Sequence, residues 1–351
     1  MAKLSGAVAS VCCCVLIAVL AGQPAAAGDG GFERTVFELG CDGSVLLDET
    51  PADGTNTEKK AAKSIGLAGF DVIDRIKAEL VAAGNHASCA DILAFAARDA
   101  ASVLSGGRIR YAVRRGRGDG ATSSAAAADA ALPGPDSSFA ELEESFAARG
   151  FGKGDLAALS GAHAVGAAHG SSFAGRLRPS ADQINETYQL ALVARQKLLQ
   201  TTATISATET TTMMNNNVRD MDPAFRAAAT YSGVGVDTAA TGALDNSYYT
   251  ANLQNMVLLK SDWELTQDEG TLARLVAYRD DAARWSKDFG DAMERLSNLR
   301  PPVGARLEVR KNCRVTNLSP GRAVVRAIKS FLQRRYDQIS CLLNFFNAGL
   351  M

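Results

Sequence analysis

The chain has 351 residues, 47% of them hydrophobic, so it can bury a sizeable core in one large domain or two small ones. Its formal net charge of −1 gives no electrostatic reason to expect binding to nucleic acid or to an anionic membrane surface. The abundance of alanine and the low aromatic content of 6% favour helices.

Residues 1–27 have the pattern of a secretory signal peptide. Lys3 supplies a positive charge, residues 7–21 form an apolar run, and residues 25–27 are small enough for a cleavage site. The apolar run is too short to span a bilayer comfortably, so no membrane span is expected. We expect the mature, secreted chain to begin near Gly28.

The cysteines that follow this leader would lie in an oxidising compartment, where disulfides persist. They are Cys41, Cys89, Cys313 and Cys341. The sequence has no CxxC pair and no cysteine–histidine cluster, so structural zinc is not expected.

The first predicted elements follow a turn-rich stretch at residues 40–48. Apolar residues at helical spacing predict an amphipathic helix over residues 71–83. Residues 89–104 predict a nearly apolar helix, which we expect to be central in the fold. Residues 111–113 predict a short strand.

Two short helices are predicted next. Ser138 and Glu141 have the spacing of a capping box, and Gly150 is expected to end the helix that begins there. Asp155 is expected to cap a second short helix that carries His163.

Residues 179–218 look like an insert. Threonine, methionine and asparagine dominate residues 201–217, and a loop of this length is uncommon in a compact domain. Helical periodicity resumes over residues 221–230 and 271–296. Residues 321–346 form a basic amphipathic tail, which fits either a packed helix or a surface-binding one.

The whole sequence has three histidines, His86, His163 and His169. Small residues on both sides of His163 would let a flat, bulky group approach its imidazole. The alternative for a lone histidine near the end of an apolar helix is a packed or capped side chain. His86 lies in a polar stretch and is expected to be exposed to solvent.

Several motifs occur together in one order along the chain. They are residues 40–48, 69–77, 88–94 with 96–99, 132–135, 159–169, 245–249, 261–262 and 313–317. This series resembles the secreted plant haem peroxidases, the class III family, over most of residues 40–317. The resemblance implies an all-α fold with haem b held between two halves.

The same resemblance predicts a domain organisation and a location. Residues 28–317 would form the peroxidase domain, interrupted by the insert at 179–218 and with the family's N-terminal helices largely missing. Residues 318–351 would be an extension outside the family. The protein would be a monomer in the extracellular space or the cell wall.

Matching positions imply roles in haem binding. His163 would be the axial ligand of the iron, and Asp262 would accept a hydrogen bond from the other ring nitrogen. That bond fixes the tautomer and makes the imidazole more electron-donating. Pro133 would present a backbone carbonyl to the donor channel, hydrogen peroxide and phenolic small molecules would be the substrates, and His169 would be structural.

The distal side departs from the family pattern. A histidine that moves the peroxide proton and an arginine that stabilises developing charge are expected there. Arg34 occupies the histidine position and Gly30 the arginine position, while Lys63 replaces an asparagine that would orient the histidine. We therefore expect impaired turnover.

The resemblance also implies two calcium sites, both with ligands missing. The distal set would comprise the backbone oxygens of Glu38 and Gly40 and the side chains of Asp42, Ser44 and Glu58, with Thr35 in place of an aspartate. The proximal set would keep Asp237 and Asp245, with Ala164 and Ala240 in place of threonines.

Family positions imply a disulfide between Cys89 and Cys313. Cys41 has lost its family partner, since Val36 occupies that position. A replacement bridge between Cys41 and Cys341 is the alternative to a free thiol at Cys41.

Three hypotheses remain open from the sequence. The first is a secreted, hydrogen-peroxide-dependent oxidoreductase for phenolic donors. The second is a non-catalytic relative that binds haem or a phenolic. The third is a faulty translation of a peroxidase gene, with a missing N-terminal exon, an intron retained around residues 179–218 and an unrelated tail after Asn317.

Overall fold

The computed structural model describes residues 41–48, 56–64, 67–178, 182–202, 213–215, 218, 242–301 and 305–317. Several predicted features lie outside these ranges. They are the signal peptide, Gly30, Arg34, Glu38, Gly40, Asp237, the helix at residues 221–230, Cys341 and the tail after Asn317.

Helices dominate the described residues, as the all-α prediction requires. The strands among them form two short antiparallel pairs, β1 (Asp119–Gly120) with β4 (Leu307–Glu308) and β2 (Ala167–His169) with β3 (Met213–Asn215). Among the described residues, no helix is both long enough and apolar enough to cross a membrane.

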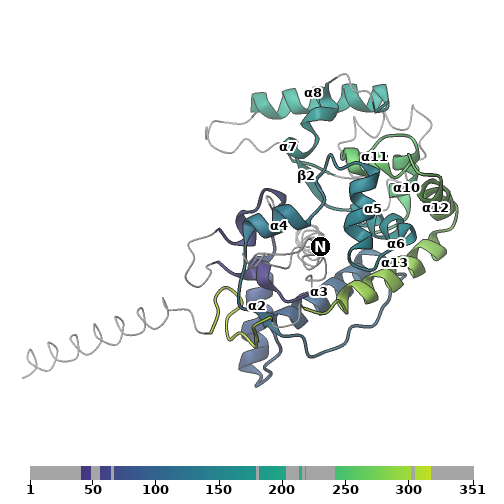
Figure 1. The fold of residues 1–351 in the computed structure, drawn as a ribbon. Helices are drawn as coiled ribbons and strands as arrows, with labels where there is room; N and C mark the ends of the chain where they lie inside the picture. The colour runs from purple at the N-terminus through teal and green to yellow at the C-terminus, as the bar shows by residue number, and fades with distance from the viewer. Residues whose placement is uncertain are drawn as a thin grey trace, which may run out of the picture.

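One group of helices gathers around α6 (Lys153–Ser160), as Figure 1 shows. Helix α6 packs against α12 (Glu269–Asp280) and α13 (Ala282–Ser297), and α12 also packs against α10 (Ser247–Leu253). Helices α5 (Phe139–Ala147) and α11 (Lys260–Glu264) complete the group. Its centre holds fully buried aromatic and aliphatic side chains, among them Tyr249, Leu275, Trp285 and Phe289.

The N-terminal part of the described chain is built around α2 (Phe70–Ala82) and α3 (Cys89–Leu104), which pack against each other. Ser88 caps α3, since its hydroxyl accepts the amide of Asp91 at 3.0 Å. The short elements η1 (Ser44–Leu46), η2 (Glu58–Lys60), η3 (Ala62–Ser64) and α4 (Ala125–Ala131) contact one another beside them.

Two predicted elements differ from the structure. Residues 111–113 form no strand. The helical stripe predicted over residues 271–296 is two helices, broken at Asp281, whose backbone is extended (φ −132°, ψ 90°). The Asp281 carboxylate accepts the amide of Arg284 at 2.9 Å, so this residue starts α13 instead of continuing α12.

Part of the predicted insert is ordered and belongs to the core. Helix α8 (Glu186–Thr202) follows α7 (Gly170–Phe173) and η5 (Ala174–Leu177), and lies beyond α7 at the edge of the fold in Figure 1. Tyr188 and Leu192 of α8 are fully buried in the main hydrophobic cluster. Residues 186–202 are therefore not a loop.

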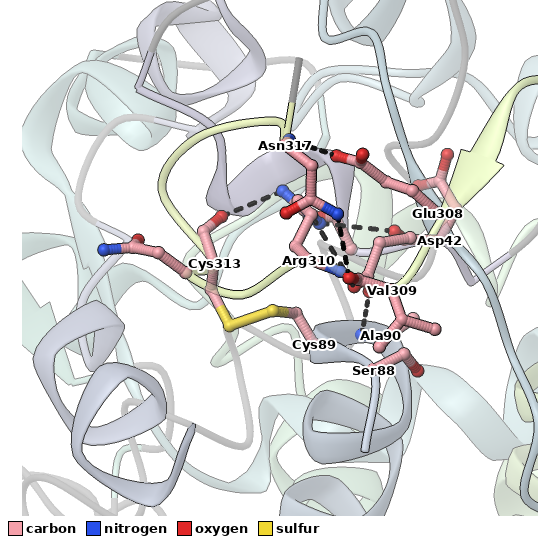
Figure 2. Close-up of polar contacts among 12 residues, drawn as sticks. Asp42, Ser88, Cys89, Ala90, Glu308, Val309, Arg310, Cys313 and Asn317 are labelled. Atoms are coloured by element: carbon pink, nitrogen blue, oxygen red, sulfur yellow. Dashed lines mark hydrogen bonds and ion pairs between the residues drawn. A yellow bond between two sulfur atoms is a disulfide. The ribbon is translucent and has the colours of Figure 1, made fainter. Parts of the chain in front are cut away.

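The predicted disulfide between Cys89 and Cys313 is present, with Cα atoms 5.6 Å apart. It joins the start of α3 to the C-terminal end of the described chain (Figure 2). Cys41 is a free, buried thiol, 3.3 Å from the carbonyl oxygen of Leu296. Of the two alternatives for Cys41, a bridge to Cys341 or a free thiol, the structure shows the free thiol. Cys341 itself lies outside the described residues.

A buried ion pair that the sequence did not reveal reinforces this junction. Arg310 and Asp119 have no exposed surface. The Asp119 carboxylate accepts the backbone amides of Ala90 at 2.8 Å and Arg310 at 2.7 Å. The Arg310 guanidinium donates to the carbonyl of Cys313, on its own segment, at 2.8 Å (Figure 2). It also donates to the carbonyl of Gly43 at 2.5 Å and lies 3.8 Å from the Asp119 carboxylate, so it links three chain segments.

Candidate functional site

His163 lies in η4 (Gly161–Ala164), the turn that follows α6. The sequence placed it on the helix itself and Asp155 at the helix cap. In the structure α6 begins after Gly152, and the Asp155 carboxylate reaches back to accept the Gly152 amide at 3.1 Å. Asp155 therefore stabilises the first turn from inside the helix.

Aromatic side chains fix the chain just before His163. Tyr249 OH donates to the carbonyl of Ala157 at 2.9 Å, and Trp285 Nε1 donates to that of Ala158 at 3.1 Å. A Cβ atom at Gly161 would lie only 2.5 Å from Tyr249 OH and 2.6 Å from Trp285 Nε1. Glycine is thus required at position 161, which explains one of the small residues in the motif.

The structure brings His163 and Asp262 together, although they are 99 positions apart. Nδ1 of His163 lies 2.9 Å from Oδ1 of Asp262. The carboxylate side chain is 6% exposed, whereas the imidazole is 36% exposed. Ala162 and Ala164 on either side of His163 are buried, so the ring is the open part of this turn.

Burial and the Asp262 carboxylate act on the pKa of His163 in opposite directions. Burial lowers the pKa of His163, but the negative charge of Asp262 and the hydrogen bond to it outweigh burial and raise that pKa above its ordinary value. Because the carboxylate holds a proton on Nδ1, the second ring nitrogen is the one available to a ligand.

Two further residues, for which no role was expected from the sequence, hold Asp262. Tyr248 OH donates to Asp262 Oδ1 at 2.9 Å, and Asn252 Nδ2 donates to the Asp262 carbonyl at 2.8 Å. Tyr248 and Asn252 occupy successive turns on one face of α10. The available signal was Tyr248 within the motif at residues 245–249, with Asn252 four positions later on the same helix face.

Pro133 is half-buried in the loop between α4 and α5. The loop is tied to the site at Pro135, whose carbonyl accepts the amide of Ser261, next to Asp262, at 2.9 Å. On its other side, Lys63 Nζ donates to the carbonyls of Asp129, at 2.5 Å, and Leu132. Lys63 therefore anchors the peptide that leads into Pro133.

The other histidines lie elsewhere. His86 is exposed between α2 and α3, as predicted. His169 is buried in β2, and neither of its ring nitrogens has a hydrogen-bond partner among the described residues. The structural role expected for His169 stays a prediction.

The described residues of the predicted distal calcium site lie together. Asp42, Ser44 and Glu58 are all buried, and Asp42 Oδ1 accepts the Ser44 amide at 3.0 Å. Burial, reinforced by the nearby charge of Asp42, raises the pKa of Glu58 well above its ordinary value. In the described part of the chain, both Glu58 carboxylate oxygens lack a hydrogen-bond partner.

Such a buried, unpartnered carboxylate fits a bound cation. Within the described ranges, no three histidine, cysteine or acidic side chains converge on one point. Hydroxyl and backbone oxygens would therefore have to complete a distal site.

The proximal calcium prediction is only partly covered by the described residues. Asp245 precedes α10, and its Oδ1 accepts the amide of Ser247 at 3.0 Å. Ala164, which replaces a threonine ligand, is fully buried. Of the two predicted carboxylates, the structure therefore describes Asp245, while Asp237 lies outside the described residues.

Comparison with known proteins identifies the family. The peroxidase family model matches residues 32–281. Peroxidase 40 of Arabidopsis thaliana is 36% identical over 284 residues, covering 80% of this chain and 74% of its own length. Peroxidase 2 of Zea mays is 36% identical over 283 residues, covering 80% of this chain and 76% of its own.

A third relative gives the same result. Peroxidase RIP1 of Medicago truncatula is 35% identical over 283 residues, covering 79% of this chain and 77% of its own length. Sequence motifs, helical fold and relatives agree, and the chain belongs to the peroxidase family, in its plant class III branch.

Proposed function

We propose that this chain binds haem b through His163 and performs slow, hydrogen-peroxide-dependent oxidation of phenolic donors. The observation that carries the proposal is the 2.9 Å contact between His163 Nδ1 and the buried carboxylate of Asp262. Membership of the peroxidase family supports the reaction class, an oxidoreductase that acts on peroxide.

The residues around His163 fit the prosthetic group. The imidazole is the exposed part of a turn, and the alanines on either side of it are too short to cover the ring. When bound, haem supplies the iron that reduces peroxide and oxidises the donor. Asp262 holds the Nδ1 proton, so that Nε2 of His163 would be the nitrogen that coordinates the iron.

Slow turnover follows from the distal substitutions. Arg34 stands where the family has the histidine that moves the peroxide proton, and arginine stays protonated near neutral pH. The sequence has only His86 and His169 besides the proposed ligand, and these are exposed and buried in β2, respectively. Loss of general acid–base catalysis typically lowers rates by about 10²–10⁴-fold.

Secondary features of the proposal rest on the same family relation. The carbonyl of Pro133 would receive the phenolic donor, in a loop held by Lys63. Calcium would bind at the distal site beside Asp42 and Glu58, where it would compensate two buried carboxylates. Asp237 and Asp245 would contribute to a second, weaker site.

The proposal extends to processing and location. Residues 1–27 would be cleaved as a signal peptide, leaving a secreted monomer whose peroxidase domain ends near Asn317. N-terminal sequencing of the protein from the medium of a secreting host should begin at Gly28. Retention of the intact leader on the secreted protein would contradict this part of the proposal.

A non-catalytic haem-binding relative is the second candidate, favoured by Arg34 and Gly30 at the distal positions. An activity assay decides between the slow peroxidase and the non-catalytic relative. It uses the full chain, expressed in a secreting host and supplied with haemin. We expect peroxide-dependent oxidation of guaiacol that is slow and that Arg34→His accelerates, with Arg34→Lys as the matched control.

Each outcome has a distinct meaning. No oxidation by either the wild type or Arg34→His would favour the non-catalytic relative. Wild-type oxidation at the rate of an intact family member, measured in parallel, would contradict the expected impairment. Failure of the folded wild type to take up haem would overturn the proposal.

A further inference from the structure

One carboxylate oxygen of Asp262 is shared by two donors. His163 Nδ1 and Tyr248 OH each lie 2.9 Å from Oδ1. Tyr248 is 2% exposed and Asp262 is 5% exposed, so bulk water is kept from this contact. In such surroundings a hydrogen bond to a charged oxygen is stronger than it would be in water.

Asn252 fixes the direction of the phenol proton. Its amide lies 2.8 Å from the backbone carbonyl of Asp262, which can only accept, so the amide nitrogen must face that carbonyl. The same nitrogen lies 3.0 Å from Tyr248 OH and donates its second proton there. Because the phenol oxygen accepts from Asn252, its own proton is directed at Asp262.

We propose that Tyr248 is a positioning residue that limits how strongly His163 donates electrons to the haem iron, by competing for Asp262 Oδ1. This inference rests on the proposed ligation of haem by His163. The phenol draws negative charge from the shared oxygen, so the carboxylate pulls less on the Nδ1 proton of the imidazole. The imidazole consequently keeps less imidazolate character, which is the property that an outer-shell partner tunes.

A buried tyrosine on another helix provides a matched control. Tyr278 of α12 is also fully buried, and its hydroxyl donates to a carboxylate oxygen of Asp288 at 2.9 Å. Tyr248→Phe and Tyr278→Phe each remove one buried hydroxyl that donates to a carboxylate. Only Tyr248→Phe removes a donor from Asp262.

The test uses the full chain loaded with haem. In Tyr248→Phe we expect the iron–histidine stretch of the ferrous protein to move to higher frequency in resonance Raman spectra. The reduction potential should become more negative, since the stronger ligand favours ferric iron. In Tyr278→Phe both the stretching frequency and the reduction potential should match the wild type. A Tyr248→Phe protein that matches the wild type, or a Tyr278→Phe protein that shifts as much, overturns the inference.

A second measurement does not need haem. In the haem-free protein, the Nδ1 proton resonance of His163 should move downfield in Tyr248→Phe, because its hydrogen bond to Asp262 strengthens. An unchanged resonance overturns the inference. Absence of haem uptake by the wild type would instead defeat the proposed function, so the two failures are distinguishable.

Asn252→Ala covers the case in which Tyr248→Phe does not fold. It removes the group that directs the phenol proton while keeping the phenol. We expect the same shifts in the same direction, but smaller. No shift in folded Asn252→Ala, by either measurement, counts against the inference.

Discussion

At the scale of single residues, the site depends on the negative charge of Asp262. Asp262→Asn keeps the size of the side chain and removes the charge that polarises His163. Changes to such partners of a metal ligand typically cost about 10–100-fold in metal affinity or activity. We expect a loss of that size in haem affinity, measured by transfer of haem to an excess of an apo-globin.

Asp280→Asn is the control for this change. Asp280 is an exposed carboxylate at the end of α12 that pairs with Arg279. Its replacement should leave haem affinity at the wild-type value. Equal haem retention by Asp262→Asn and Asp280→Asn would show that the carboxylate does not support the ligand.

Glu58 gives a pH-dependent prediction for the calcium-free protein. Burial first, and then the charge of Asp42, raise the pKa of Glu58 above its unfolded value of 4.5. The folded protein therefore holds the proton more tightly than the unfolded chain. This contribution to stability is present below pH 4.5 and is lost as the pH rises through the folded pKa.

Glu58→Gln removes this loss because glutamine does not ionise. In the presence of a calcium chelator, we expect the free energy of unfolding of Glu58→Gln to exceed that of the wild type by an amount that grows with pH. Buried unsatisfied groups cost about 1–3 kcal/mol, which sets the scale near neutral pH. Urea denaturation at several pH values measures the difference in the free energy of unfolding. Glu79→Gln, at an exposed glutamate, is the control.

Calcium should reverse the order of stability of the wild type and Glu58→Gln. Added calcium would stabilise the wild type at neutral pH, and stabilise Glu58→Gln less. Identical stabilisation of both variants would argue against a cation at this carboxylate.

At the scale of elements, the capping box marks the start of α5 in the sequence and stabilises the first turn of that helix. Ser138 Oγ accepts the amide of Glu141, and Glu141 accepts the Ser138 amide at 2.8 Å. Ser138→Ala should lower the free energy of unfolding by about 0.5–2 kcal/mol, because a helix-end amide loses its partner. Chemical denaturation measures the change, and the exposed Ser171→Ala should cost nothing measurable.

Local signals explain which elements could be predicted from sequence. The helices α2 and α3 and the start of α5 were predicted within a residue, because apolar spacing and caps are encoded locally. The break at Asp281 was missed because both flanking segments continue the helical period. Helix α8 was missed because its apolar residues, including the buried Tyr188 and Leu192, do not gather on one face at helical spacing.

The candidate site was predictable in its residues but only partly in its geometry. Family motifs pointed to His163 and Asp262, and the structure brings them into contact. The roles of Tyr248 and Asn252 depend on how α10 packs beside α11. The buried pair of Asp119 and Arg310 joins residues 191 positions apart, a contact that no local pattern encodes.

At the scale of the whole molecule, the disulfide ties the N-terminal and C-terminal parts of the described fold. Cys89 and Cys313 are separated by 224 positions, so their bond restricts a large loop of the unfolded chain. Replacing both by alanine should lower the free energy of unfolding by about 2–5 kcal/mol. Chemical denaturation of the double variant measures this loss of stability. Cys41→Ala, which removes a free thiol and no disulfide, is the comparison.

A stability loss no larger than that of Cys41→Ala would show that other contacts hold this junction. The buried carboxylate of Asp119 is the alternative, since it accepts the amides of Ala90, next to Cys89, and of Arg310, near Cys313.

The most direct test of the account asks whether the imidazole at position 163 binds iron. The optical spectrum of the haem-loaded full chain should show a five-coordinate, histidine-ligated ferric centre. His163→Gly should lose that spectrum, and free imidazole added to the variant should restore it. A folded His163→Gly protein with the unchanged wild-type spectrum, before any imidazole is added, would contradict the account.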